Sequence, residues 1–206
     1  MTILHESITD TEHAFSALRQ GKPVVVIDDL GARPDCELVF AARHATTELV
    51  ALAVRYTSGF LVVALPEPEA DRLRLSAQGP ADRGAPAFGV AVDAEGTGTG
   101  ISSDARARTI ALLGTPGTDP EVLRRPGHVV TYRAHPDGVL GRATAREAAF
   151  DLVRLAGAGF AAAGACLMSE RDPLQEAGPD EARDWALSFG VPVVTASGVL
   201  AHRLAH

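Results

Sequence analysis

The chain has 206 residues, of which 46% are hydrophobic and 22% are charged, and its formal net charge is −7. These values are typical of one soluble globular domain over 1–206, and they argue against a general nucleic-acid binder, whose affinity depends on clustered cations. No apolar run reaches the roughly 18–20 residues of a membrane helix and no secretory signal is apparent, so a cytoplasmic protein without membrane contacts is expected.

Helical and extended patterns alternate along the chain, and capping residues or glycines mark many of the boundaries. In chain order we expect a helix ending at Gly21, strands at 23–27 and 38–42, a helix at 48–56, a strand at 60–65, a short helix after two prolines, a strand at 87–92, a helix from near Ser103, a strand at 128–134, a helix at 142–157, a strand at 164–169, a helix at 180–190, a strand at 192–197 and a terminal helix. This alternation predicts an α+β domain, a mixed β-sheet with helices packed on it. The glycine- and proline-rich segment 76–87 is expected to be a mobile surface loop.

An acidic loop follows the first strand, in VVVIDDLGARPDCE at 24–37. Asp28 and Asp29 stand at the mouth of a buried strand, where paired carboxylates are typical of a reaction centre. Cys36 lies inside this loop, where a thiol could be reactive, although two free thiols (Cys36 and Cys166) in a reducing compartment are the simpler expectation.

Three further features offer chemistry, each with a plainer alternative. The glycine-rich stretch EGTGTGISSDAR at 95–106 precedes a helix start, which suits an oxyanion, but a tight structural loop explains it equally well. His128 follows a Pro-Gly turn and is either a titrating group or a structural histidine. Arg142 sits at a loop-to-helix transition and either clamps a phosphate or is simply solvated.

Together these pieces resemble one family, 3,4-dihydroxy-2-butanone 4-phosphate synthase of riboflavin biosynthesis. Four blocks in the same order carry the resemblance: VVVIDD at 24–29, RYTSG at 55–59, DAEGTGTGISSDAR at 93–106, and RRPGHV, DGVLGRAT and EAAFDLVRLAG within 124–157. The resemblance implies an α+β fold and a homodimer with active sites at the subunit interface. It also implies a magnesium-dependent conversion of ribulose 5-phosphate to formate and a four-carbon phosphorylated product.

The chain departs from the family pattern at the implied working residues. The family arginine falls on Ala32 and its metal-binding glutamate on Arg33; the histidine ligand falls on Ala145 and the threonine beside it on Arg146. A further catalytic glutamate is expected at Met168. Replacing a carboxylate by a guanidinium changes the local charge by about two units, which disfavours a divalent ion. We therefore expect no metal and no cofactor, and we expect that the chain does not make the riboflavin precursor.

The leading hypothesis is a repurposed, metal-independent enzyme of a specialised pathway, a lyase, isomerase or dehydratase acting on a small oxygenated substrate. Its expected catalytic residues are Asp28, Asp29, Asp35, Glu37 and His128, and its expected substrate-binding residues are Arg33, Tyr56, Ser58, Thr99, Ser102, Arg106, Arg142, Arg146 and Glu147. One alternative is an inactive sugar-phosphate-binding or partner subunit. Another is that the family reaction survives through a metal site relocated to Asp35, Glu37 and Glu147.

Overall fold

The computed structural model describes residues 2–31, 34–79 and 87–205, and in that part of the chain it forms one seven-stranded mixed sheet in the order β4-β5-β3-β6-β2-β1-β7. The strands are β1 Val24–Asp28, β2 Asp35–Ala41, β3 Val62–Pro66, β4 Phe88–Ala94, β5 Leu123–Ala134, β6 Ala162–Cys166 and β7 Val193–Thr195. Two neighbouring strand pairs are parallel, β1 with β7 and β3 with β5, and the other four are antiparallel. The expected mixed sheet is therefore present.

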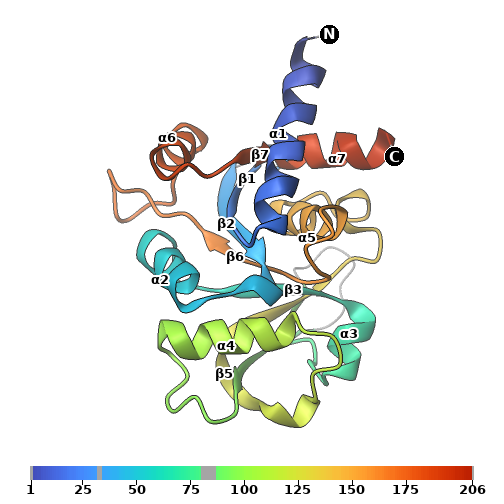
Figure 1. The fold of residues 1–206 in the computed structure, drawn as a ribbon, viewed down its shortest axis with the longest axis vertical. Helices are drawn as coiled ribbons and strands as arrows, with labels where there is room; N and C mark the ends of the chain where they lie inside the picture. Colours follow the sequence, from blue (N-terminus) through green and yellow to red (C-terminus); the bar gives the residue numbers. More distant parts are fainter. Residues whose placement is uncertain (1, 32–33, 80–86, 206) are drawn as a thin grey trace.

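Helices cover both faces of the sheet (Figure 1). They are α1 Thr2–Arg19, α2 Thr47–Tyr56, α3 Glu67–Arg72, α4 Ser103–Leu113, α5 Ala145–Leu155, α6 Pro179–Phe189 and α7 Ala196–Ala205, with short 3₁₀ turns η1 Ala42–His44, η2 Pro120–Val122 and η3 Gly138–Leu140. None of the described helices is long and apolar enough to cross a membrane.

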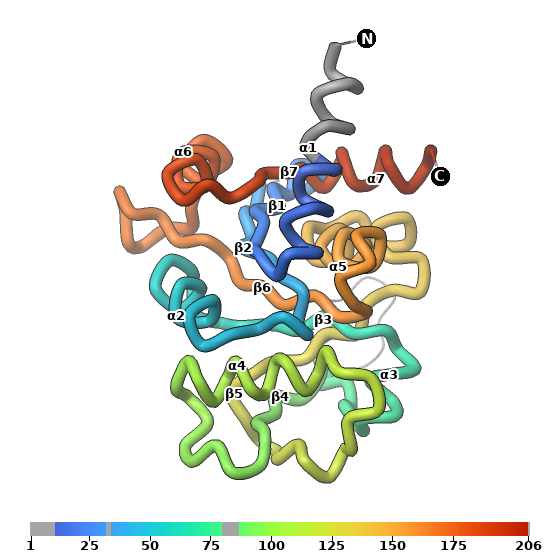
Figure 2. Tube along the Cα trace, viewed as in Figure 1, coloured from blue at the N-terminus to red at the C-terminus, as the bar shows by residue number. Residues whose placement is uncertain are grey.

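The core lies in two layers, one on each face of the sheet. Along β1, Val25 and Ile27 pack with the layer under α2, α4 and α6, whereas Val24 and Val26 pack with the layer under α1, α5 and α7. All four side chains are buried, because successive residues of a strand point to opposite faces and both faces are covered. The tube in Figure 2 shows α5 and α7 together on the same side of the sheet as α1.

The expected elements are present, with shifted boundaries. Thr46 caps α2 by accepting a hydrogen bond from the Leu49 N–H (3.2 Å), and Gly190 ends α6 in the left-handed region at φ 65°. The largest difference is β5, which begins at Leu123 and runs through the Pro126-Gly127 pair that was expected to be a turn. A Cβ atom on Gly127 would lie 1.9 Å from the carbonyl carbon of Val92, so glycine here permits β4 to approach closely.

The expected mobile loop at 76–87 falls mainly on 80–86, which lie outside the described residues. In the described part of that segment, Ala77 forms a bridge with Gly89 at the start of β4. The segment thus begins as an extension of the sheet.

Candidate active site

A cavity of about 250 Å³ opens where β1 and β2 meet the N-terminus of α5. It is lined by eight described residues, most of them polar: Asp28, Asp35, Glu37, Tyr132, Arg142, Thr144, Ala145 and Arg146. Five of these were expected site residues. The fold brings them together because β2 lies between β1 and β6 in the sheet while α5 packs across the same face.

Asp28 fixes the frame of the cavity. Its Oδ1 accepts hydrogen bonds from the N–H groups of Leu30 (3.0 Å) and Gly31 (3.3 Å), and its Oδ2 accepts one from the N–H of Ala145 (2.9 Å). A carboxylate at a helix N-terminus accepts a hydrogen bond from an otherwise unpaired N–H group, and its negative charge interacts favourably with the helix dipole. These bonds tie the end of β1 to the start of α5, and they hold the expected site residue Asp28 in the lining of the cavity.

Glu37 and Arg146 form a buried ion pair on one wall. Nη2 of Arg146 donates to Oε1 of Glu37 at 2.6 Å, and the Glu37 side chain is only 5% exposed. Burial raises the pKa of Glu37, and the Arg146 charge opposes this rise. The Arg146 guanidinium also lies over the rings of Phe88 (5.3 Å) and Tyr132 (5.6 Å).

Tyr132 links this pair to a second one, Arg142 with Glu147. Nη1 of Arg142 lies 2.8 Å from Oε1 of Glu147 and also donates to the Tyr132 hydroxyl, which in turn donates to Oε1 of Glu147 at 3.0 Å. The N–H of His135 donates to the same carboxylate. Burial raises the pKa of Glu147 to about 7 and that of Tyr132 to about 12. Glu147 is fully buried, is absent from the cavity lining and holds Arg142 in place.

A third group of polar side chains lies at the edge of the cavity. One ligand-type atom from each of Asp35, Cys166 and Glu176 lies within 4.8 Å of the others. Glu37 pairs with Cys166 across β2 and β6, so their side chains share a face, whereas Met168 lies beyond β6, where its N–H donates to the carbonyl of Tyr56. Cys166, and not Met168, therefore lies beside Asp35 and Glu37, and the sequence analysis did not name it as a site residue.

Neither cysteine has an environment that activates a thiol. Burial raises the pKa of Cys166 to about 12 and that of Cys36 to about 11, and Cys36 is 1% exposed. The simpler expectation of two free thiols is therefore confirmed, and Cys36 packs in the core beneath the sheet, where a thiol is inert.

Two expected site residues belong to other parts of the structure. Asp29 accepts hydrogen bonds from the N–H (2.8 Å) and the hydroxyl of Ser197, at the start of α7. Tyr56 packs against Trp185 (5.6 Å between ring centroids) and Phe189 (5.0 Å) between α2 and α6. Both are absent from the lining of the cavity, so the structure does not bring them together with the other expected site residues there. Arg33 lies outside the described residues.

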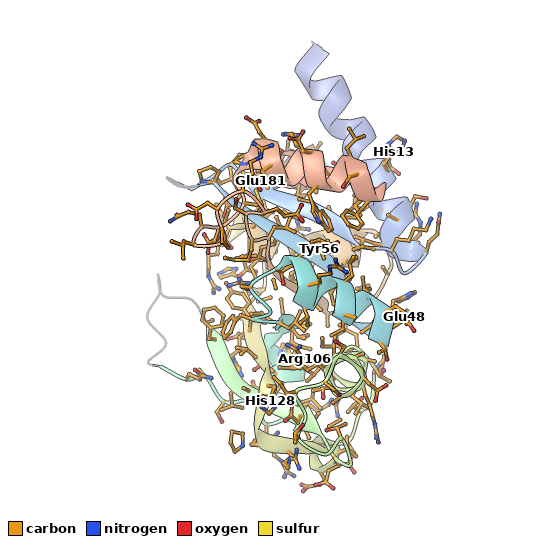
Figure 3. The ribbon with its side chains drawn as sticks, turned by 90° about the vertical axis from the view of Figure 1, so that its left-hand side faces the viewer. His13, Glu48, Tyr56, Arg106, His128 and Glu181 are labelled. Atoms are coloured by element: carbon orange, nitrogen blue, oxygen red, sulfur yellow. The ribbon has the colours of Figure 1, made fainter. Side chains whose placement is uncertain are left out.

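A separate cluster surrounds His128, on the part of the molecule formed by β4, β5 and α4 (Figure 3). Asp93, 1% exposed, accepts hydrogen bonds from the His128 N–H (2.9 Å) and lies 2.8 Å from its Nδ1, while 41% of the His128 side chain is exposed. Arg106 donates to the carbonyl of Gly59 at 3.0 Å, which ties α4 to the RYTSG turn. This carboxylate–histidine pair leaves Nε2 of the ring available to a ligand.

The remaining expected residues of this cluster are hydroxyl groups. Ser102 caps α4 by accepting from the N–H of Ala105 (3.1 Å), Ser58 accepts from the N–H of Phe60 (3.3 Å), and Thr99 is exposed in the glycine-rich loop. His128 and Tyr132 are four positions apart on β5, about 13 Å along a strand. Within one chain the structure therefore separates the His128 cluster from the cavity.

The profile of the 3,4-dihydroxy-2-butanone 4-phosphate synthase family matches residues 12–202. The chain belongs to the 3,4-dihydroxy-2-butanone 4-phosphate synthase family. Curated relatives include the riboflavin biosynthesis protein RibBA of Salinispora arenicola, 51% identical over 149 residues, and that of Mycobacterium marinum, 42% identical over 202 residues. These matches cover 71% and 97% of this chain but 36% and 48% of the relatives, so the chain spans about half the length of the curated relatives at most.

Solved 3,4-dihydroxy-2-butanone 4-phosphate synthases have the same fold. One in complex with two magnesium ions is 33% identical, with a TM-score of 0.85 over 93% of this chain and 94% of its own. The enzyme from Candida albicans is 31% identical, with a TM-score of 0.85 over 93% and 95% of the two chains. The recognised family and the α+β fold are thus both confirmed.

Of the two positions where the family resemblance puts the metal ligands, the described part of the chain contains only Ala145 and not Arg33, and the residues around Ala145 do not fit a magnesium ion. Magnesium requires oxygen ligands in near-octahedral geometry. Ala145 has no donor in its side chain, Glu37 is bound to Arg146, and both oxygens of Asp28 accept backbone hydrogen bonds. The nearby group of possible ligands includes the Cys166 thiol, which is a poor ligand for a hard cation.

Proposed function

We propose that this family member is a lyase, isomerase or dehydratase that acts on a small oxygenated substrate by acid–base chemistry, without a divalent cation. The observation that carries the proposal is the pair of guanidinium groups, Arg142 and Arg146, that line a cavity also containing carboxylates. A small hydroxylated carbonyl compound suits these dimensions and this polar lining.

The arrangement supports enolisation as the first step. A carboxylate removes the proton next to the substrate carbonyl, and the guanidinium groups stabilise the negative charge that develops on the carbonyl oxygen. Asp35 is the best-placed base, because Asp28 is held by the backbone and Glu37 by Arg146. Arg142 is kept in place by Glu147 and Tyr132 and is available to an anionic group of the substrate.

We also propose a homodimer in which His128 of one subunit serves the cavity of the other. The separation of the two clusters within one chain supports this arrangement, as does the exposure of a histidine whose partner Asp93 is buried. In such a dimer the protonated histidine would donate a proton to the enolate, and Asp35 would release to solvent the proton that it removed.

A second candidate function is the magnesium-dependent formation of 3,4-dihydroxy-2-butanone 4-phosphate and formate from ribulose 5-phosphate. It is supported by the relatives named for riboflavin biosynthesis, up to 51% identical, and by a solved synthase containing magnesium. The poor fit of the cavity to this ion favours the first candidate.

Proton NMR with ribulose 5-phosphate in deuterated water separates the candidates. Loss of the substrate's carbon-bound proton signals by deuterium exchange, with equal rates in magnesium and in chelator, supports metal-independent enolisation; Asp35→Asn should abolish it. Formate that appears only with magnesium supports the second candidate and contradicts the first. Broadened substrate signals without any exchange would instead indicate a binding subunit, and Arg142→Ala should then remove the broadening.

Subunit mixing tests the dimer. An Asp35→Asn variant and a His128→Ala variant should each be inactive alone, because each lacks one half of every site. After unfolding and refolding together, mixed dimers contain one intact site, so activity returns only if the site is shared between subunits. A mixture as inactive as its components contradicts the proposal.

A further inference from the structure

The Arg146 side chain is held on three sides within the cavity. Its guanidinium bonds Glu37 at 2.6 Å and lies over the rings of Phe88 at 5.3 Å and Tyr132 at 5.6 Å. Only 21% of the side chain is exposed. A side-chain cation held by a buried carboxylate and two aromatic faces is fixed in position. Unlike a metal ion, it supplies positive charge without a binding step.

Tyr132 makes this arrangement part of a longer network. The guanidinium of Arg142 also lies over the Tyr132 ring, with its carbon 5.5 Å from the ring centroid. Arg142 in turn pairs with the fully buried Glu147. The cavity wall therefore alternates acid, arginine, phenol, arginine and acid. Each guanidinium therefore has a carboxyl partner within the wall.

The same residues remove the oxygen ligands that a metal would use. Ala145 and Arg146 are consecutive in the lining at the start of α5, and neither offers an oxygen or an imidazole. Glu37 is the most buried acid of the lining, and its Oε1 is bound by Arg146. A divalent ion placed beside Glu37 would also face the guanidinium charge at close range.

We infer that Arg146, held by Glu37, Phe88 and Tyr132, is a built-in replacement for the divalent cation in this cavity. The inference rests on the proposed metal-independent function and names the group responsible for it. It implies that removing the arginine, which frees Glu37, while adding one ligand should open the site to an ion.

The test measures Mn²⁺ binding by water-proton relaxation, with no substrate present, so that it does not depend on turnover. Mn²⁺ is an oxygen-preferring probe that also accepts imidazole. The Ala145→His, Arg146→Thr double variant should bind Mn²⁺ at least about tenfold more tightly than the wild type, because Glu37 is freed and a ligand is added. Arg154→Thr, on the same helix but outside the cavity, makes the same charge change and should leave binding unchanged.

Two results would overturn the inference. One is wild-type Mn²⁺ binding that weakens in Glu37→Gln, because Glu37 would then already serve an ion beside Arg146. The other is a double variant that unfolds cooperatively like the wild type yet gains no affinity. If the double variant does not fold, the single Arg146→Thr variant decides: a gain over Arg154→Thr supports the inference, and equal binding contradicts it.

Discussion

Two regions carry the residues that sequence comparison picked out, and they differ in how they hold charge. Around His128 the residues match the family pattern, and the partly exposed histidine contacts a buried aspartate, Asp93. Around the cavity several residues depart from that pattern, and every described arginine in the lining is paired with an acid. The departing Arg146 and the retained Arg142 each have an acidic partner, Glu37 and Glu147, and Tyr132 contacts both arginines, so the two pairs form one network.

The largest change in stability is expected when one member of this network is removed. Arg146→Ala leaves Glu37 buried without its partner, and we expect the free energy of unfolding to fall by about 2–3 kcal/mol. Glu37→Gln in the same background should recover part of the loss, because a neutral amide costs less to bury. Urea denaturation of the four members of this cycle measures the coupling. Additive effects would show that the ion pair contributes no coupling energy.

A second test uses pH. Glu147 has a pKa raised by burial from 4.5 to about 7, so between these pH values the folded chain holds a proton that the unfolded chain releases. This carboxyl therefore makes the protein less stable as pH rises through that window, by on the order of 1–3 kcal/mol. Glu147→Gln should flatten the dependence of the free energy of unfolding on pH. An unchanged slope in urea titrations across the window would contradict the assignment.

In the other region, Asp93→Ala should cost about 1–2 kcal/mol, because the buried aspartate satisfies the His128 N–H and approaches Arg124 at 3.8 Å. Hydrogen exchange of the His128 amide should accelerate in this variant. Glu95→Ala, a change at an exposed position just after β4, is the control and should lie within about 0.5 kcal/mol of the wild type. Equal effects of the two changes would remove the distinction between the regions.

The smallest effect concerns the thiols. Both cysteines have a pKa far above neutrality, so neither should react appreciably with a disulfide reagent at pH 8 in the folded protein. Cys166, which is partly exposed, should react before Cys36, and both should react once urea unfolds the chain. Rapid labelling of Cys36 in the native protein would contradict its buried position.

Local sequence signals predicted the elements of the fold well, because capping residues, glycines and apolar runs act over short distances. Thr46 and Ser102 cap α2 and α4, close to the expected helix starts, and Gly190 ends α6 at the expected end. The Pro126-Gly127 pair was wrongly predicted to form a turn. Glycine is needed there because Val92 of β4, which lies earlier in the chain, approaches closely, and no local signal shows this.

The site was predictable only in part. Motif correspondence located Glu37, Arg142 and Arg146, but not their partners. Tyr132 lies within an expected strand and Cys166 near the end of another, and nothing local distinguishes such residues from ordinary core positions. Strand alternation is the one signal that could have marked Cys166, and it requires knowing that β6 pairs with β2.

The end of β1 is a junction between distant parts of the chain. Asp28 holds the first N–H of α5, 117 residues away, and Asp29 holds an N–H of α7, 168 residues away. Local opening of β1 therefore releases two helices at once. The amides of Ala145 and Ser197 should therefore exchange with solvent in a single correlated event. A cut or truncation in the last helix should then also speed the exchange of the Ala145 amide at the wall of the cavity.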